Sequence, residues 1–307
     1  MKELWTEKYR PTTIEDYAWQ DASQEAQVRL WINEKSIPHI LLSGSAGTGK
    51  TTLAKVLIKA MDLDPNDVLI INASRDNDVD TMRKRIINFA STMPFGRFKV
   101  ILLDEADYLS RDAQAVMRGV METYADNCRF ILTCNYPNKI LPAIHSRTQG
   151  FHVDKVDYLM FTERAAKILI AEEIEFDLDT LDTYVTAAYP DLRKCINNLQ
   201  MASVDGKLMG PRAITEGTVD YRVKMVELFK DGHILEARKL ANANVKPDEM
   251  EDFFRWMYDN LDLWSSTQAG KDKAVTIIRD GLVNHSMIAD TEINLSATLV
   301  ELTTIDV

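Results

Sequence analysis

The sequence predicts an α/β protein whose first half builds a sheet around a phosphate-binding loop and whose second half is helical. Residues 44–52 read Gly-Ser-Ala-Gly-Thr-Gly-Lys-Thr-Thr, which contains the G-x-x-x-x-G-K-T pattern of loops that cradle phosphates. The pattern stands between an apolar run at residues 40–42 and an amphipathic helical pattern at residues 53–61. From residue 157 onward, strand-like apolar runs give way to helical periodicity.

The loop has the strand-then-helix context that phosphate binding requires. Its glycines let the backbone turn tightly and point N–H groups inward, and the dipole of the following helix favours negative charge there. We expect Lys50 to reach the β- and γ-phosphates of a nucleotide and the Thr51 hydroxyl to hold Mg²⁺. The alternative is a chance glycine-rich turn, which the full motif in this context disfavours. The predicted nucleotide-binding residues of the loop are Gly44, Gly47, Thr48, Gly49, Lys50, Thr51 and Thr52.

An apolar strand that ends in carboxylates follows later in the chain. Residues 99–107 read Lys-Val-Ile-Leu-Leu-Asp-Glu-Ala-Asp, the Walker B pattern. We expect Asp104 to orient Mg²⁺, directly or through its water shell, and Glu105 to polarise the attacking water as general base. Paired acids after a strand also cap helices, but a phosphate loop in the same chain favours the catalytic interpretation.

Composition restricts the class of protein and its partners. A length of 307 residues allows two or three domains, and a hydrophobic content of 46% supports real cores. No apolar run is long enough for a membrane span, and the first residues lack the apolar core of a signal peptide. The three cysteines form no C-x-x-C pair, which disfavours a zinc module or disulfides and indicates a reducing cytosol. A net charge of −11 requires that any DNA contact come from a local basic surface.

The remaining segments of the first half predict an arm, a helix and further strands. Pro11 and a Thr12–Glu15 capping box predict an extended arm, structural on its own, that runs into a short helix. Residues 23–33 predict a helix, and residues 68–71, 129–135 and 150–153 predict strands. Asn135 ends one of these strands, where open α/β sheets bind ligands, and is a candidate to sense the γ-phosphate. His39, before the first strand, is interpreted as structural.

Two helical patterns carry positive charge. Residues 83–85 read Arg-Lys-Arg and form either a DNA-facing helix end or, somewhat favoured, a solvated face. In the helix predicted after Ser110, Arg111, Gln114 and Arg118 share one polar face. That face meets DNA or another subunit, or it faces solvent, and the pattern gives these alternatives equal weight.

The second half predicts helices at residues 158–173 and 178–188, a third helix that carries Arg193, and helices throughout residues 219–307. Gly206 and the pair Gly210-Pro211 predict a hinge or linker between two helical domains. Helix packing is the default interpretation of the last segment, and a subunit interface is the alternative.

Read in order, these landmarks resemble the AAA+ sliding-clamp loaders of DNA replication. The residues that carry the resemblance are Glu7-Lys-Tyr-Arg-Pro11, the phosphate loop, Asn72-Ala-Ser74, Asp104-Glu-Ala-Asp107, Asp112-Ala-Gln114, Thr133-Cys-Asn135, Ser146-Arg147 and Leu192-Arg193. The resemblance implies a P-loop AAA+ ATPase domain with a parallel sheet flanked by helices (1–155), a small helical lid (156–208) and an all-α collar for oligomerisation (209–307). The short length, the missing zinc module and residues 290–295 are similar to the large, ATPase subunit of a T4-like phage clamp loader.

The resemblance also implies roles for individual residues. The N-terminal arm of the family packs against adenine, which implies nucleotide contacts for Thr6, Glu7, Lys8 and Tyr9, with backbone near Ala18 closing the pocket. Arg193 matches the lid arginine that contacts the γ-phosphate of its own subunit. Arg147, otherwise ordinary surface charge, matches the arginine finger that serves the ATP of a neighbour. This chain has Ser-Arg-Thr148 where the family has Ser-Arg-Cys, and the role is expected to survive because the arginine carries the charge. The positions that imply DNA contact are Arg75, Arg83, Arg111 and Arg118.

The implied activity is ATP hydrolysis, with Mg²⁺, that opens a sliding clamp and loads it onto primer–template DNA. The implied partners are other copies of the chain, a small clamp-loader subunit, the clamp, and DNA that is bound independently of its sequence. No membrane partner is expected. The implied location is the cytoplasm of a bacterial host. Exposed apolar residues within 93–98 are candidates for clamp contact. The alternatives are an AAA+ helicase loader or remodelling ATPase, and a non-catalytic scaffold subunit. Intact Lys50, Asp104, Glu105 and Arg147 speak against the scaffold.

Overall fold

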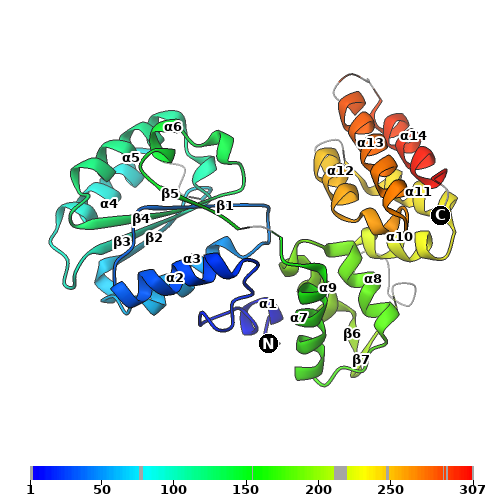
Figure 1. The fold of residues 1–307 in the computed structure, drawn as a ribbon, viewed down its shortest axis with the longest axis horizontal. Coiled ribbons are helices and arrows are strands. Elements are labelled where there is room, and N and C mark those ends of the chain that lie inside the picture. Colours follow the sequence, from blue (N-terminus) through cyan, green and yellow to red (C-terminus); the bar gives the residue numbers. More distant parts are fainter. Residues whose placement is uncertain are drawn as a thin grey trace. The chain divides into compact units, whose positions relative to one another are not determined.

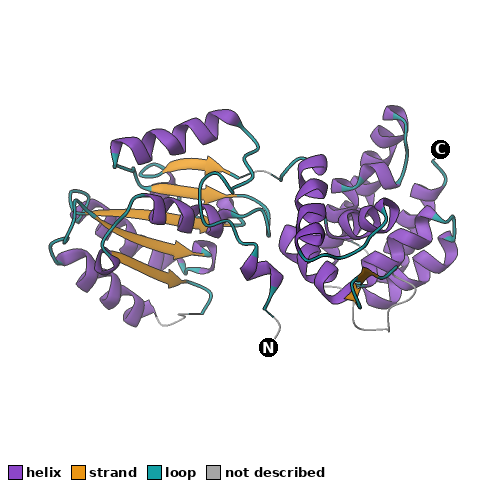
Figure 2. Cartoon of the chain, turned by 90° about the horizontal axis from the view of Figure 1, so that it is seen from below, coloured by secondary structure: helices purple, strands orange, loops and turns teal. Residues whose placement is uncertain are grey.

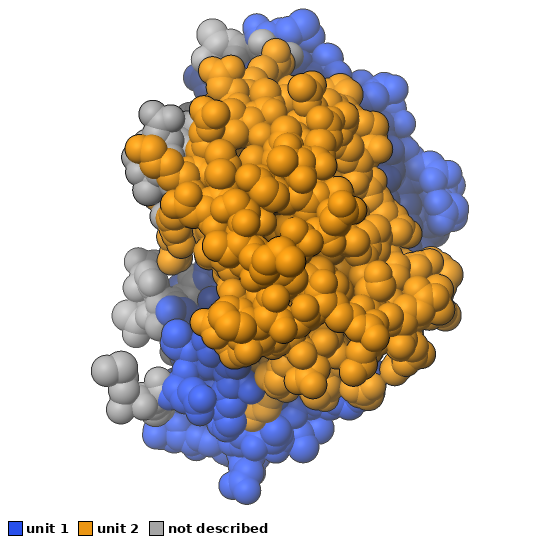
Figure 3. All heavy atoms as spheres, turned by 90° about the vertical axis from the view of Figure 1, so that its left-hand side faces the viewer, with its two compact units in different colours: residues 1–8, 158–307 blue, residues 9–157 orange. Residues whose placement is uncertain are grey.

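The chain folds into two compact units, residues 9–157 and residues 1–8 with 158–307, called here the sheet unit and the helical unit (Figure 3). The computed structural model describes residues 3–75, 79–153, 155–210, 220–246, 249–285, 287 and 290–305. The division into an ATPase domain, a lid and a collar stays a prediction. None of the helices in the described ranges combines the length and the apolarity needed to cross a membrane.

The sheet unit contains five parallel strands, as the sequence predicts. The strands are β1 (Ile40–Ser43), β2 (Val68–Asn72), β3 (Lys99–Asp104), β4 (Cys128–Cys134) and β5 (Gln149–His152), and their order in the sheet is β2-β3-β4-β1-β5. This order differs from the chain order and sets β4 between β1 and β3 (Figure 1). The strand that leads into the phosphate loop and the strand that ends in the Walker B acids are therefore both neighbours of β4.

Helices cover both faces of the sheet (Figure 1). One face packs against α2 (Ala22–Glu34) and α3 (Lys50–Ala60), and the other packs against α4 (Val79–Ser91), α5 (Arg111–Thr123) and α6 (Pro142–His145). Successive side chains of a strand point to opposite faces, so alternate residues of β3 enter the two cores. A strand buried on both sides reads as an unbroken apolar run, which explains why the sequence predicts β3 so clearly. Short 3₁₀ turns are η1 (Pro65–Asp67), η2 (Ala106–Tyr108) and η3 (Pro137–Lys139).

His39 has a structural contact at the start of β1. Its Nδ1 atom accepts a hydrogen bond of 3.0 Å from the Phe130 N–H of β4. Burial, helped by the charge of Arg129, lowers the pKa of His39 to about 4, so the ring is neutral at pH 7 and can accept this bond.

The N-terminal arm differs from its prediction. A short helix, α1 (Trp5–Lys8), replaces the predicted extended segment, and it packs in the helical unit, where the Trp5 N–H donates to Gln200 Oε1 at 3.0 Å. The predicted capping box and short helix are wrong: residues 13–17 form turns, and Thr13, not Thr12, pairs with Asp16 at 2.8 Å. Burial of Ile14 and Tyr17 in the sheet unit fixes this path, and tertiary packing overrides a weak local signal.

The helical unit begins with α7 (Tyr158–Ala171), α8 (Leu178–Ala188) and α9 (Leu192–Ala202). The helices agree with the prediction, but the sequence predicts no strands here, whereas β6 (Ser203–Val204) and β7 (Lys207–Leu208) form a small antiparallel hairpin (Figure 2). Asp205 and Gly206 have φ angles of 48° and 78° and form its turn, the Asp-Gly pattern of two-residue hairpins. Gly206 is therefore a hairpin turn and not a hinge, and Pro211 of the predicted linker lies outside the described residues.

The rest of the helical unit consists of α10 (Tyr221–Lys230), α11 (Ile234–Asn244), α12 (Met250–Asp259), η6 (Leu261–Leu263), α13 (Gln268–His285) and α14 (Thr291–Thr303). Trp256 and Trp264 are buried and meet edge to face, with ring centroids 6.5 Å apart. The Trp256 Nε1–H donates to the Thr186 carbonyl of α8 at 3.2 Å, so the later helices pack on the earlier ones. Both tryptophans therefore anchor the core of the helical unit.

Candidate nucleotide-binding site

The phosphate loop joins β1 to α3 and needs glycine at two of its positions. Gly44 has a φ of 151°, and a Cβ atom there would lie 2.1 Å from the Val153 carbonyl oxygen at the end of β5. Gly49 has a φ of 94° and immediately precedes α3. Because Gly49 has no side chain to cap α3, the first N–H groups of that helix are available to an anion.

Lys50 folds back over the loop. Its side chain is buried, and Nζ donates to the Gly44 carbonyl at 3.0 Å and to the Ser45 carbonyl at 2.6 Å. Thr48 also turns inward, and its hydroxyl donates to the Ser45 carbonyl at 2.9 Å. The ammonium group is therefore held at the loop itself, the position from which a lysine reaches nucleotide phosphates.

A hydrogen-bond network joins the phosphate loop to the Walker B strand. Asp104 Oδ1 accepts from the Thr51 hydroxyl at 2.6 Å and from the Thr133 hydroxyl at 2.7 Å. The Glu105 N–H donates to Thr133 Oγ1 at 2.9 Å, and Glu105 adopts a left-handed φ of 58°. Thr133 thereby fixes the carboxylate of Asp104 and the backbone of Glu105 together.

The Thr51 hydroxyl and the Asp104 carboxylate fit Mg²⁺. Both are hard oxygen donors, and their separation allows one ion to contact both, directly or through water. Among the described residues, no group of three or more histidine, cysteine or acidic side chains could hold a metal. This donor set suits Mg²⁺ in a nucleotide complex, where phosphate oxygens and water supply most of the ligands.

Thr133 and Asp107 had no role assigned from the sequence. Thr133 is the one hydroxyl residue of β4, and this polar exception could have indicated its role. Asp107 is buried, and its Oδ2 atom accepts from the backbone N–H groups of Asn135 and Tyr136, both at 3.1 Å. Its other oxygen, Oδ1, is buried without a hydrogen-bond partner among the described residues. Asp107 thus fixes the backbone of half-buried Asn135, just after β4. The sequence feature that could have identified Asp107 is its place as the third carboxylate of Asp-Glu-Ala-Asp.

Cys134 lies beside this network as a neutral thiol. Burial, with the neighbouring Asp107 carboxylate, raises its pKa to about 12 against the opposing charge of Lys50. A thiol with this pKa is protonated at pH 7, so it is a poor nucleophile there.

Arg147 lies at the end of α6 on the surface of the sheet unit. Its Nη1 group donates to the Ala143 carbonyl at 2.7 Å, and its Nη2 group forms an ion pair with Glu122 of α5. The relative exposure of its side chain is 34%. Arg147 is thus directed to the surface, whereas Lys50 is directed into its own loop.

The predicted site residues divide between the two units. The sheet unit contains the phosphate loop, Asp104, Glu105, Asn135 and Arg147, and also Tyr9 and Ala18. The helical unit contains Thr6, Glu7 and Lys8 of α1, and exposed Arg193 of α9. Lys8 forms an ion pair of 2.7 Å with Glu172, which follows α7, so α1 is joined to the end of α7.

Arg75, Arg83, Arg111 and Arg118 are all exposed on the sheet unit, but the predicted polar face of α5 is wrong for Gln114. Gln114 is buried, with a relative exposure of 1%. Its amide nitrogen donates to the Leu109 and Lys139 carbonyls, both at 3.1 Å, and its oxygen accepts from the Leu141 N–H at 2.8 Å. A buried amide that satisfies several backbone groups fixes a loop, which helical periodicity alone cannot distinguish from a solvent-facing position.

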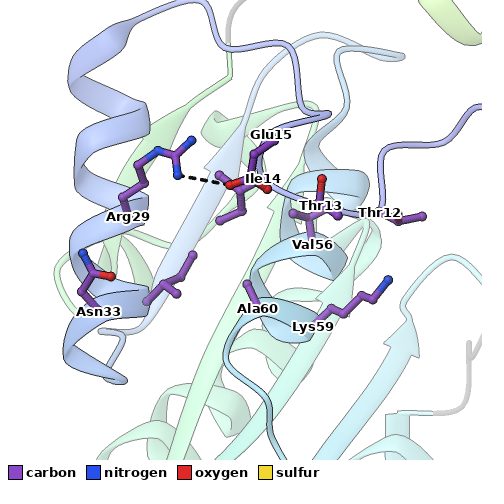
Figure 4. Close-up of a pocket in the computed structure, with 10 residues that line it drawn as sticks. Thr12, Thr13, Ile14, Glu15, Arg29, Asn33, Val56, Lys59 and Ala60 are labelled. Carbon is purple, nitrogen blue, oxygen red and sulfur yellow. Dashed lines mark hydrogen bonds and ion pairs between the residues drawn. The ribbon is translucent and has the colours of Figure 1, made fainter.

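A separate pocket of about 340 Å³ lies between the turn at residues 12–15, α2 and the C-terminal half of α3 (Figure 4). Ile14 and Val56 line it with apolar surface, and the Glu15–Arg29 ion pair of 3.3 Å lies at its edge (Figure 4). None of its lining residues belongs to the phosphate loop or to the Walker B strand. It is therefore distinct from the predicted nucleotide site.

Comparison with known proteins supports the nucleotide-site interpretation. Residues 40–153 match the family model of AAA, the ATPase family associated with various cellular activities. The replication factor C small subunit of Archaeoglobus fulgidus is 37% identical over 248 residues, covering 78% of this chain and 77% of that protein. The same subunit from Methanococcus vannielii is 38% identical over 251 residues, covering 78% of each, and that from Sulfurisphaera tokodaii is 38% identical, covering 77% and 74%.

Solved structures share the fold at low sequence identity. The Thermotoga maritima RuvB Holliday junction branch migration motor matches with a TM-score of 0.54 and 13% identity, over 73% of this chain and 80% of that one. A variant of the same protein matches with a TM-score of 0.57 and 12% identity, over 80% and 88%. At this identity the match establishes only the fold, which agrees with the predicted AAA+ architecture. The relatives and the AAA match show that the chain belongs to the replication factor C small-subunit family. The chain is a clamp-loader AAA ATPase of DNA replication.

Proposed function

We propose that the chain is the large, ATPase subunit of a T4-like phage clamp loader, which uses ATP to open a sliding clamp and place it on primer–template DNA. The observation that carries the catalytic part is the contact of Asp104 Oδ1 with both Thr51 and Thr133, at 2.6 and 2.7 Å. That contact joins the phosphate loop, the Walker B acid and β4, the strand that Asn135 follows.

Each residue of the site in one subunit has a distinct task. The loop N–H groups and Lys50 bind the phosphates, and Thr51 with Asp104 holds Mg²⁺, which neutralises charge that develops on the phosphates. Glu105 orients the attacking water and accepts its proton, and Asn135 contacts the γ-phosphate. In this proposal Thr6, Glu7, Lys8 and Tyr9, with backbone near Ala18, enclose adenine, and Arg193 contacts the γ-phosphate from the lid.

The ATP site is completed by a neighbouring copy. Arg147 is partly exposed on the sheet unit and is available to another subunit, where a guanidinium stabilises the charge of the transition state. Turnover therefore depends on assembly with other copies and with a small clamp-loader subunit. The helices of residues 209–307 provide the contacts of a collar that holds the subunits together.

The T4-like assignment rests on residues 290–295, Asp-Thr-Glu-Ile-Asn-Leu. This segment begins α14, and Asp290 caps it by accepting from the Glu292 and Ile293 N–H groups. A phage origin implies the cytoplasm of a bacterial host.

DNA binding rests on local positive charge in an acidic chain. Arg75, Arg83, Arg111 and Arg118 are exposed, while the net charge is −11. Contacts from these arginines to backbone phosphates are independent of base sequence and weaken with salt.

The sheet unit also presents an apolar loop that suits a clamp. Met93 and Phe95 are each 76% exposed, whereas Phe98, at the end of the predicted segment, is buried and is no longer a candidate. Fully buried Asp67 fixes the loop, because its two oxygens accept from the Phe95 N–H at 3.0 Å and from the Gly96 N–H at 2.7 Å. A rigid backbone that exposes two large apolar side chains suits an apolar pocket on a partner.

The test is steady-state ATPase of the complex with its small subunit, with and without clamp and primed DNA. We expect clamp and DNA together to stimulate turnover more than either alone. Phe95→Ala should remove the response to clamp and keep the response to DNA, whereas Leu30→Ala, at an exposed residue of α2, should change neither. Stimulation by DNA without any effect of clamp would instead support a helicase loader or remodelling ATPase. Nucleotide binding without turnover would support a scaffold subunit.

A further inference from the structure

The guanidinium of Arg147 is held within its own subunit on two sides. Nη1 donates to the Ala143 carbonyl of α6 at 2.7 Å and contacts the Ser146 hydroxyl at 3.3 Å. Nη2 pairs with the carboxylate of Glu122, at the C-terminal end of α5. In the part of the chain that the structure describes, Arg147 is the cation paired with Glu122.

The ion pair is weak enough to exchange. The side chains of Arg147 and Glu122 are 34% and 47% exposed, so water and salt screen their attraction. An exposed pair of this kind orients a side chain without locking it.

A phosphate can replace the carboxylate in the same contact. Carboxylate and phosphate oxygens both accept hydrogen bonds from the planar guanidinium fork, and a γ-phosphate carries more negative charge than a carboxylate. The two acceptors therefore compete for one edge of Arg147.

We propose that Glu122 is a positioning residue that holds Arg147 against α5 in the separate subunit and yields it to the γ-phosphate of a nucleoside triphosphate bound by the neighbouring copy. This inference rests on the proposed role of Arg147 at the neighbour's ATP. Glu122 opposes assembly by a small amount, and it does not touch the reacting atoms. Once the subunits are joined, Arg147 lies on the phosphate and Glu122 has no further part in the chemical step.

Competition between Glu122 and the phosphate predicts that loss of the Glu122 charge changes the apparent affinity and leaves the maximal rate unchanged. Glu122→Gln keeps the size of the side chain and removes its charge, so Arg147 is released to the neighbour more readily. The concentrations of ATP and of subunit that give half-maximal turnover should fall, by about threefold to fivefold for a pair of this exposure. The maximal rate should stay at the wild-type value.

The experiment measures ATPase of the complex with the small subunit, clamp and primed DNA, over ATP and subunit concentration. It compares wild type, Glu122→Gln, Arg147→Ala and the double variant. Glu163→Gln, which neutralises an exposed acid paired with Lys167 on α7 at 2.7 Å, is the matched control and should change nothing. In the Arg147→Ala background, Glu122→Gln should not restore turnover, because the charge on Glu122 acts only through Arg147.

Two results would overturn the inference, and they are distinguishable from failure of the proposed function. If Arg147→Ala is inactive and Glu122→Gln either lowers the maximal rate or leaves both concentrations unchanged, Glu122 does not compete with phosphate. If Arg147→Ala keeps wild-type turnover, the proposed role of Arg147 fails, and this inference fails with it.

Discussion

The two regions of the sheet unit that are proposed to act on ATP are constructed differently. At the carboxyl ends of β1, β3 and β4, Lys50 is held by two carbonyls of its own loop, and Asp104 is held by two threonine hydroxyls. Arg147, by contrast, is partly exposed and is held by the Ala143 carbonyl, the Ser146 hydroxyl and one surface ion pair. The first region is held by hydrogen bonds within its own subunit, whereas the second is proposed to exchange its partner when a neighbour arrives.

This difference separates nucleotide binding from turnover. The donors of a buried network are already oriented when the chain has folded, so nucleotide binding requires little rearrangement of their side chains. An exposed guanidinium keeps much of its freedom and can be contributed to another surface. A single subunit is therefore expected to bind ATP competently and to hydrolyse it poorly.

The largest effect is expected for Arg147→Ala. Loss of an arginine supplied from a neighbour should reduce turnover of the assembled complex by about 10³- to 10⁵-fold, because transition-state charge loses its partner. The affinity of the separate subunit for ATP should stay near the wild-type value, measured by titration of that subunit with a fluorescent nucleotide. If affinity falls as far as turnover, Arg147 belongs to the binding region and the contrast between the two regions disappears.

Glu105→Gln tests the organised region in the same assay. The amide preserves the shape of the side chain but cannot accept the proton of the attacking water, so turnover should fall by about 10²- to 10⁴-fold. Binding of ATP should persist, as seen in the same titration. The matched control is Glu15→Gln, an exposed residue of the same unit, which should retain full activity. Full turnover of Glu105→Gln would show that another group is the base.

Thr133→Val should give the smallest of these effects. Valine fills the space of threonine but removes the hydroxyl that contacts both Asp104 and Glu105. Loss of this contact should cost about tenfold in turnover and should raise the Mg²⁺ concentration needed for half-maximal rate. The control is Thr162→Val on α7, where the hydroxyl donates only to the Tyr158 carbonyl. An unchanged Mg²⁺ dependence would mean that Asp104 does not need Thr133 for its position.

The sequence by itself determined the strands, the phosphate loop, the Walker B acids and the change to helices after residue 157. These features are local: glycine spacing, runs of apolar residues and helical periodicity act over a few residues, so they can be read along the chain. Asp104 and Thr51 could be expected to meet because both follow strands of one parallel sheet.

Only the tertiary structure decided which strands are neighbours and what each polar side chain contacts. Thr133 reaches Asp104 because β4 lies between β1 and β3, and that order is not written in any local pattern. Gln114 has the spacing of a solvent-facing residue but is buried by a loop more than twenty residues away in the chain. Contacts between distant segments depend on how the whole core packs, and a weak local preference yields to that packing.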